Sequence, residues 1–310
     1  MRQYLSVLLA FIVFVMPTMG QETFLPKIEK ISNYLPHMTT VEVQNLLKRS
    51  DMVIIPVGAL EQHGPHLPIG TDFLNGLERA KLIGIAGDIL VAPILFPGQS
   101  PYHMGFKGTI TLPSTLIQEV YLEATKSLIQ HGFKKFLILN AHGGNTAITR
   151  FIVDRINQET AGIAVDLVSA VGPLIERNTN VSGPGETDLQ LDRHAGTPET
   201  SNSMYLIPEL VNLDNAIVAD ISLPDHLASM LPLVLEGDPV ARTVFLAEGL
   251  KSEITGKGTS AIEMTTTGVW GDRNPNESTS ERGRLNTESF VNASLLFIDQ
   301  WNDLRPIGVP

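Results

Sequence analysis

Short apolar runs separated by amphipathic stretches dominate the chain from about residue 50 onward. Each run is continuously apolar, without polar residues in alternation, which is typical of parallel strands covered on both faces. The runs occupy 52–57, 89–96, 135–140 and 163–171. The pattern therefore predicts a buried, parallel sheet.

Helical spacing fills the intervals between these runs. In 114–132 apolar residues recur at every fourth position from Leu116 to Leu128, and Gly132 is placed to end the helix. Further helices are predicted over 73–87, 145–161 and 287–302. This alternation predicts an α/β fold, with three α/β/α layers around a mostly parallel central sheet.

The regular alternation stops near residue 172, and three later stretches are predicted to be loops. These are 172–197, 222–240 and 265–285, which are polar or irregular in pattern. Neither an internal repeat nor a linker-like change of composition divides the chain. One domain over 21–310 is the simplest division.

The first twenty residues have the layout of a secretory signal. Arg2 precedes an apolar stretch over 5–16, and small residues follow up to Gly20. This arrangement predicts cleavage after Gly20 and export of the mature chain to the periplasm or the exterior of the cell. An uncleaved N-terminal anchor is the alternative, although the stretch is short for a membrane span.

Composition narrows the chemistry further. A net charge of −11, with no run of Lys or Arg, argues against nucleic acid as a partner. The absence of cysteine leaves only His, Asp and Glu as side chains for a metal site.

Ligand-type side chains follow two of the predicted strands. After the run 52–57 come Glu61, His63, His66 and Asp72. After the run 135–140 comes His142, in the motif "AHGGN". Because ligands bind beyond the carboxyl ends of parallel strands, we expect these side chains to converge there. Carboxylates and imidazoles are ligands for Zn, Mn and Fe(II), and a carboxylate can bridge two ions.

A third cluster, "DRHAGTPETS" over 192–201, adds His194 and Glu199. Each cluster alone has an ordinary interpretation: a polar turn, a helix capped by Asn145, or solvated loop residues. The three together favour a metal-dependent site.

The motifs "PVGALEQHGPHLPIGTD", "NAHGGN" and "HAGTPETS" resemble the creatininase (creatinine amidohydrolase) family. Residues 103–116 and 267–285 resemble it as well, so the likeness runs from about 40 to 300. The resemblance implies a single α/β/α domain, a two-metal amidohydrolase site and assembly into a homo-oligomer.

The resemblance also implies a ligand set. One metal is expected on Glu61, Asp72 and His142, and the second on His63, a bridging Asp72 and Glu199. Creatininase itself has a glutamate two residues after its "NAHGGN"-type histidine, where this chain has Gly144.

The chain resembles the branch of the family that carries an "HGGN" motif, and this resemblance implies that the glutamate of the "HAGxxET" motif, Glu199, completes the second site instead. The departure at Gly144 argues against creatinine as the substrate and points to the wider family of amide, formamide and peptide hydrolases.

Two divalent ions, Zn, Mn or Fe, are expected to activate a water that attacks an amide or lactam carbonyl. His194 is the expected proton shuttle to the leaving nitrogen, and Glu199 serves the catalytic centre as a ligand. His66, Phe106 and Trp270 are candidate substrate contacts, although packing explains each of them equally well.

Three rival functions stay open at this point. A metal-dependent peptidase or deformylase would use the same scaffold. An exported binding protein would keep the fold without catalysis. A nucleotide-binding module would use "HGGN" as a phosphate loop. This alternative is the weakest of the three, because the motif lacks the glycine and lysine pattern of a P-loop.

Overall fold

The computed structural model describes residues 28–95, 97–178, 194–271 and 274–308. Residues 31–310 form one compact unit, and the residues up to Lys30 are assigned to another. The predicted signal segment, 1–20, lies outside the described residues. In the part of the chain that is described, no helix has the length and apolarity needed to cross a membrane.

A parallel sheet forms the centre of the compact unit, with its strands in the order β2-β1-β3-β4. The strands are β1 Met52–Val57, β2 Leu90–Val91, β3 Lys135–Asn140 and β4 Ile163–Asp166. β1 and β3 pair along their full length, so that both end at the same edge of the sheet.

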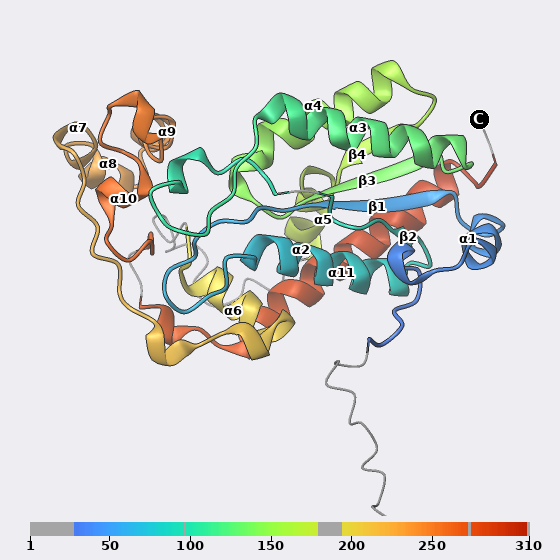
Figure 1. Ribbon diagram of the computed structural model, residues 1–310, viewed down its shortest axis with the longest axis horizontal. Coiled ribbons are helices and arrows are strands. Elements are labelled where there is room, and N and C mark those ends of the chain that lie inside the picture. Colours follow the sequence, from blue (N-terminus) through green and yellow to red (C-terminus); the bar gives the residue numbers. More distant parts are fainter. Residues whose placement is uncertain (1–27, 96, 179–193, 272–273, 309–310) are drawn as a thin grey trace, which may run out of the picture. The chain divides into compact units, whose positions relative to one another are not determined.

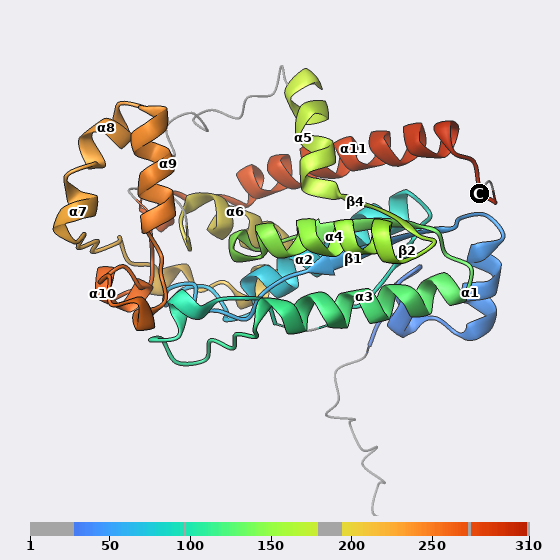
Figure 2. The ribbon, with the colours of Figure 1, turned by 90° about the horizontal axis from the view of Figure 1, so that it is seen from above.

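Helices cover both faces of this sheet (Figures 1 and 2). One face packs against α3 Ser114–Gln130 and α4 Thr146–Glu159, with Leu46 of α1 Thr40–Leu47 in the same core. The other face packs against α2 Thr71–Ala86, α5 Leu167–Asn178 and α11 Ser280–Leu304. The predicted three-layer α/β/α fold is confirmed.

Two predicted strands are shorter than expected. β2 ends at Val91, before Pro93, because proline cannot donate to the strand ladder. β4 gives way to α5 at Leu167, and the predicted strand over 163–171 is therefore wrong in its second half. A helix starts here because Asp166 accepts a hydrogen bond from the backbone N–H of Ser169, 2.8 Å away.

The predicted loops contain several helices. α5 extends to Asn178, and the described chain resumes before α6 Thr197–Leu206, so much of the predicted loop 172–197 lies outside the described residues. α11 begins inside the predicted loop 265–285, since Thr279 accepts a hydrogen bond from the N–H of Arg282. Short 3₁₀ segments complete the compact unit: η1 Leu35–His37, η2 Pro101–His103, η3 Gly143–Asn145, η5 Pro208–Leu210, η6 Leu213–Asn215, η7 Glu253–Thr255 and η8 Pro275–Glu277.

Residues 221–264 form a group of small helices, which we call the helical module (orange in Figure 1). It contains α7 Asp225–Ala228, α8 Leu231–Leu235, α9 Pro239–Glu248 and α10 Ala261–Met264. Its core consists of Leu227, Val234, Ala241, Phe245 and Met264, packed with Trp270. The loop predicted over 222–240 is thus partly helical, because its apolar residues have a core of their own to fill.

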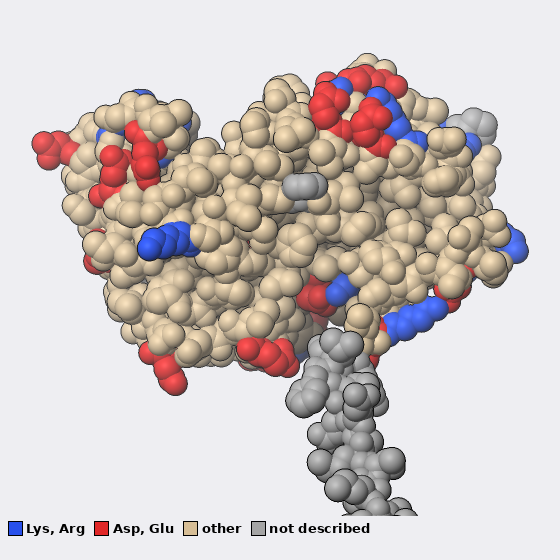
Figure 3. Space-filling view, viewed as in Figure 1, with Lys and Arg blue, Asp and Glu red and all other residues tan. Residues whose placement is uncertain are grey.

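Charged side chains gather over α3 and α4 on the face shown in Figure 3. Arg155 pairs there with both Glu119 and Glu159, at 2.7 Å to each. Acidic and basic groups are therefore interspersed on this part of the surface.

Candidate metal centre

The side chains that follow β1 and β3 meet at the shared end of these strands. Asn145 joins the loops: its Nδ2 donates to the carbonyl of Gly58 at 2.9 Å, and its Oδ1 accepts from the N–H of Gln99 at 3.1 Å. It makes no capping hydrogen bond to α4, which removes the ordinary interpretation of this motif. Gly98 lies against it, where a Cβ would come within 2.7 Å of the amide.

Glu61, Asp72 and His142 form a first group of possible ligands. His142 Nδ1 lies 3.3 Å from Glu61 Oε1 and 2.9 Å from Asp72 Oδ2. One donor atom from each residue lies within 4.8 Å of the others, and all three residues are buried. The spacing suits a single divalent cation.

His63, Asp72 and Glu199 form a second group. His63 Nε2 lies 3.4 Å from Asp72 Oδ1 and 3.6 Å from Glu199 Oε2. Asp72 and Glu199 both stand in the first turn of a helix, where the helix dipole favours a carboxylate. Asp72 belongs to both groups and offers a different oxygen to each.

Hydrogen bonds fix which ring nitrogen of each histidine faces the centre. His142 Nε2 lies 3.1 Å from the carbonyl of Gln99, so it carries the proton and leaves the Nδ1 lone pair for a metal. His63 Nδ1 lies 3.1 Å from the carbonyl of Glu61, which leaves Nε2 as the free donor. Among the described residues, neither His63 Nε2 nor Glu61 Oε2 has a hydrogen-bond partner, although both are buried. These unpartnered atoms fit a bound cation.

The pKa shifts of the centre also favour a bound cation. Burial disfavours a charged imidazole, but the carboxylates around it, led by Asp72, outweigh this and raise the pKa of His63 to about 10. In the same balance, Glu61 and Asp72 raise the pKa of His142 to about 9. Burial raises the pKa of Glu199 to about 7. Protons therefore compensate the carboxylates in the metal-free centre, and a cation that binds must displace them.

His194 lies inside the cluster, packed between His63 and His103 with ring centroids 4.2 Å and 4.3 Å away. Its backbone pairs with Trp270 in an antiparallel bridge, and its Nε2 donates to the carbonyl of Gln62 at 2.5 Å. Its Nδ1, which lies 3.5 Å from Glu61 Oε1, therefore carries no proton and keeps a free lone pair. Burial and two neighbouring imidazoles hold the pKa of His194 well below its usual range, so the ring is neutral.

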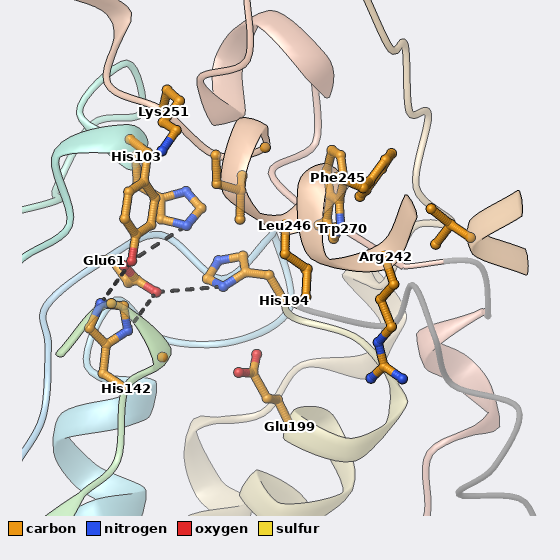
Figure 4. A pocket seen from close by; sticks show the side chains of 16 residues that line it. Glu61, His103, His142, His194, Glu199, Arg242, Phe245, Leu246, Lys251 and Trp270 are labelled. Carbon is orange, nitrogen blue, oxygen red and sulfur yellow. Dashed lines mark hydrogen bonds and ion pairs between the residues drawn. The ribbon is translucent and has the colours of Figure 1, made fainter. Parts of the chain in front are cut away.

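A cavity of about 390 Å³ opens on this cluster (Figure 4). Glu61, His142, His194, Glu199 and Trp270 line it, as do Tyr102, His103, Gly143, Gly144, Val234, Arg242, Phe245, Leu246, Gly249, Leu250 and Lys251. His66 and Phe106 are not among the lining residues. His66 is buried instead, with its Nε2 2.9 Å from Thr200 Oγ1.

His103 is a lining residue that sequence reasoning did not single out. It lies at the start of the family-like stretch 103–116, and this position was the only signal available. Gln62 Oε1 accepts from the N–H of Gly64, so its Nε2 is the donor to His103 Nδ1, 2.8 Å away. The His103 proton is therefore on Nε2, which lies 3.9 Å from Glu61 Oε2.

Gly144 has no room for the glutamate expected at this position. A Cβ there would lie 2.1 Å from the hydroxyl of Tyr102 and 2.4 Å from His142 Nε2. The Tyr102 hydroxyl itself contacts His142 Nε2 at 3.1 Å. Glu199 instead reaches the cluster from α6, with its Oε2 3.6 Å from His63 Nε2.

Residues 36–298 match the family model described as "Creatininase: Creatinine amidohydrolase". The chain is 30% identical over 190 residues to the 3-dehydro-scyllo-inosose hydrolase of Thermotoga maritima, a match that covers 59% of each protein. It is 27% identical over 234 residues to the mycofactocin precursor peptide peptidase of Mycobacterium ulcerans, covering 70% of this chain and 86% of that one. It is 28% identical over 204 residues to a creatinine amidohydrolase of Pseudomonas putida, covering 60% and 76%.

Solved structures share the fold at lower sequence identity. A creatininase described as "Creatininase Mn" superposes with a TM-score of 0.62 at 20% identity, over 89% of this chain and 99% of that one. A variant creatininase described as "Zn-Zn type" gives the same values. Since the family model spans most of the sequence and the fold agrees, the chain belongs to the creatininase family.

Proposed function

We propose that this protein is a metal-dependent hydrolase that cleaves the C–N bond of an amide. The observation that carries this proposal is the position of Asp72, which presents Oδ1 to His63 at 3.4 Å and Oδ2 to His142 at 2.9 Å. A carboxylate shared in this way is suited to bridging two divalent ions.

The first ion would be held by Glu61, Asp72 and His142, and the second by His63, Asp72 and Glu199. Zn, Mn or Fe suits this mixture of imidazole and carboxylate donors. Two such ions, when bound, supply an activated water at neutral pH and polarise an amide carbonyl. His142 Nε2 donates to the carbonyl of Gln99, and His63 Nδ1 donates to the carbonyl of Glu61. These hydrogen bonds would hold the other nitrogen of each ring in position to bind an ion.

His194 is the proposed proton carrier. Its Nε2–H is committed to the carbonyl of Gln62, so Nδ1 is the atom that takes a proton from the attacking water and returns it to the leaving nitrogen. Its position beside Glu61 also makes it a possible ligand, because Glu61, His63 and His194 form a third donor group.

His103 holds its proton on Nε2 at the wall of the cavity and can donate a hydrogen bond there. Burial and the neighbouring imidazoles lower the pKa of His103 to about 3, so it acts as a neutral donor. Donors of this kind stabilise an oxygen that gains charge during amide hydrolysis.

The substrate is proposed to be a linear or cyclic amide outside the creatinine class, because Gly144 and Tyr102 replace the glutamate of creatininase. A metal-dependent peptidase or deformylase on the same scaffold is the second candidate. The similarity to a mycofactocin precursor peptide peptidase favours that alternative. Hydrolysis of a panel of amides, lactams, formamides and short peptides separates the two.

Metal content per chain is the first test of the proposal. The wild type is expected to hold two equivalents of Zn, Mn or Fe, and Asp72→Ala is expected to hold neither. A circular dichroism spectrum of Asp72→Ala establishes that the variant is folded. Two equivalents of metal in folded Asp72→Ala would contradict the bridging role.

His194→Ala tests the proton carrier separately. We expect turnover to fall by about 10²–10⁴-fold while both metals stay bound. Loss of one metal from this variant would show that His194 is a ligand, and full turnover would exclude both roles.

Export and self-association are further proposals. Export rests on residues 1–20 alone, and mass spectrometry of the mature N-terminus tests cleavage after Gly20. Assembly into a homo-oligomer rests on family membership, and light scattering of the purified protein tests it.

A further inference from the structure

Two basic side chains line the same cavity as Glu61 and Glu199. Arg242 belongs to α9, and Lys251 follows that helix in the helical module. Among the described residues, neither cationic group has an ion-pair or side-chain hydrogen-bond partner. The nearby Lys257, in contrast, pairs with Glu248 at 2.7 Å and does not line the cavity.

The two cations stand at different ends of this cavity. In Figure 4, Lys251 lies on the side of His103, and Arg242 lies on the side of Glu199. The apolar side chains that line the cavity are Val234, Phe245, Leu246, Leu250 and Trp270. The cavity thus combines polar donor groups, apolar side chains and two separate cationic groups.

We propose that the substrate is an amide that also carries a carboxylate, such as an N-acyl amino acid or a short peptide with a free C-terminus. The inference rests on the proposed amide hydrolysis and names its substrate class. The scissile amide would lie at Glu61, His142 and His194, the apolar part against Phe245 and Trp270, and the carboxylate at Arg242. A guanidinium binds a carboxylate through two parallel hydrogen bonds, which assigns the principal contact to Arg242.

The net negative charge of the protein strengthens the case that Arg242 and Lys251 bind an anionic group. With a net charge of −11, the molecule repels an anionic ligand at long range. The carboxylate of the substrate therefore needs a local cationic contact, and Arg242 and Lys251 are the arginine and lysine among the residues lining the cavity.

Binding of small ligands tests the inference without relying on turnover. Trp270 lines the cavity, and a Trp301→Phe background makes it the sole tryptophan, since the chain has two. Fluorescence titrations of the full chain, with Zn²⁺ added, compare hexanoate, hexanamide and hexyl phosphate. We expect hexanoate to bind about tenfold more tightly than hexanamide.

The cavity variants decide where the carboxylate binds. Arg242→Met and Lys251→Met are each expected to lower the hexanoate preference several-fold, and Arg242→Lys to restore part of it. Lys126→Met, which removes an equal charge from α3 outside the cavity, is the matched control and should leave the preference unchanged. A thermal melt of each variant verifies folding.

Three outcomes overturn the inference. Equal binding of hexanoate and hexanamide excludes a carboxylate site. A preference that persists in both Arg242→Met and Lys251→Met assigns the carboxylate to bound zinc. Tighter binding of hexyl phosphate than of hexanoate makes phosphate the preferred group.

Hydrolysis assays separate this inference from the proposed function. If neutral amides are cleaved as fast as N-acyl amino acids, the proposed carboxylate preference is wrong, while the proposed amide hydrolysis still holds. If hexanoate is preferred in a way that depends on Arg242 and Lys251 but no amide is cleaved, the proposed function is wrong, while the proposed anion site still holds.

Discussion

The metal centre and the helical module line the same cavity but are built in different ways. The centre stands at the ends of β1 and β3, and its candidate ligands His63 and His142 are oriented by hydrogen bonds to backbone carbonyls. The module consists of helices of four to ten residues and leaves Leu235, Val240 and Leu246 exposed. Precise geometry is thus built on the sheet, while the apolar wall of the cavity is built on short helices with a small core.

Truncating a core side chain in each region is expected to give the largest changes in the free energy of unfolding. Ile55→Ala in β1 and Phe245→Ala in the module both remove buried side chains and are each expected to cost about 3 kcal/mol. Only Ile55→Ala should lower metal content, because the strand carries the centre. Phe245→Ala should keep both metals and lose substrate affinity. Calorimetry with metal analysis makes the comparison, and equal metal loss would show that the two regions fold as one unit.

Acid should weaken metal binding strongly. The pKa of His63 is raised to about 10 and that of His142 to about 9 in the metal-free centre, so both rings hold protons at pH 7. Each displaced proton makes metal affinity fall about tenfold for every pH unit below these values, and affinity levels off above pH 10. Competition titrations with a chelator at pH 6, 7 and 8 measure the slope. A flat profile would contradict ligation by these imidazoles.

A methyl group at Gly144 should disturb the first donor group. Gly144→Ala would press on Tyr102 and on His142 Nε2, which turns the ring and lowers metal affinity by about 10–100-fold. Gly143→Ala is the matched control, since nothing lies within 4 Å of a Cβ at that position. Equal metal affinities for the two variants would remove the steric explanation for this glycine.

The smallest effect is expected on the surface of the module. Lys257→Met removes an ion pair with Glu248 on the surface and should leave the free energy of unfolding almost unchanged, because solvent and salt screen exposed pairs. Urea unfolding measures it. A loss of several kcal/mol would mean that the module depends on surface pairing more than on its core.

The sequence predicted the sheet better than the segments that follow it. The runs 52–57 and 135–140 match β1 and β3 residue for residue, because strands buried on both faces are apolar throughout. The run 163–171 was assigned wholly to a strand, yet α5 begins at Leu167. Periodicity alone cannot distinguish a buried strand from a buried helix over so short a length.

Donors that follow buried strands were readable from the sequence pattern, whereas the role of Glu199 and the division into two groups came from the resemblance to the creatininase family. Glu61, Asp72 and His142 come together, as do His63, Asp72 and Glu199. His103 could not be singled out, because its ring is oriented by Gln62, 41 positions away in the sequence. His194 was expected on a loop above the centre, and its pairing with Trp270 holds it within the cluster instead.

The sequence by itself determined the residue types of the donor set and the strands that carry them, because apolar runs and ligand spacing are local properties. Only the tertiary structure decided which oxygen of Asp72 faces which histidine, which ring nitrogens are free, and that Arg242 and Lys251 share the cavity. Those features depend on packing between segments far apart in the chain. Local pattern does not encode such contacts, since each is fixed by the shape of its distant neighbours.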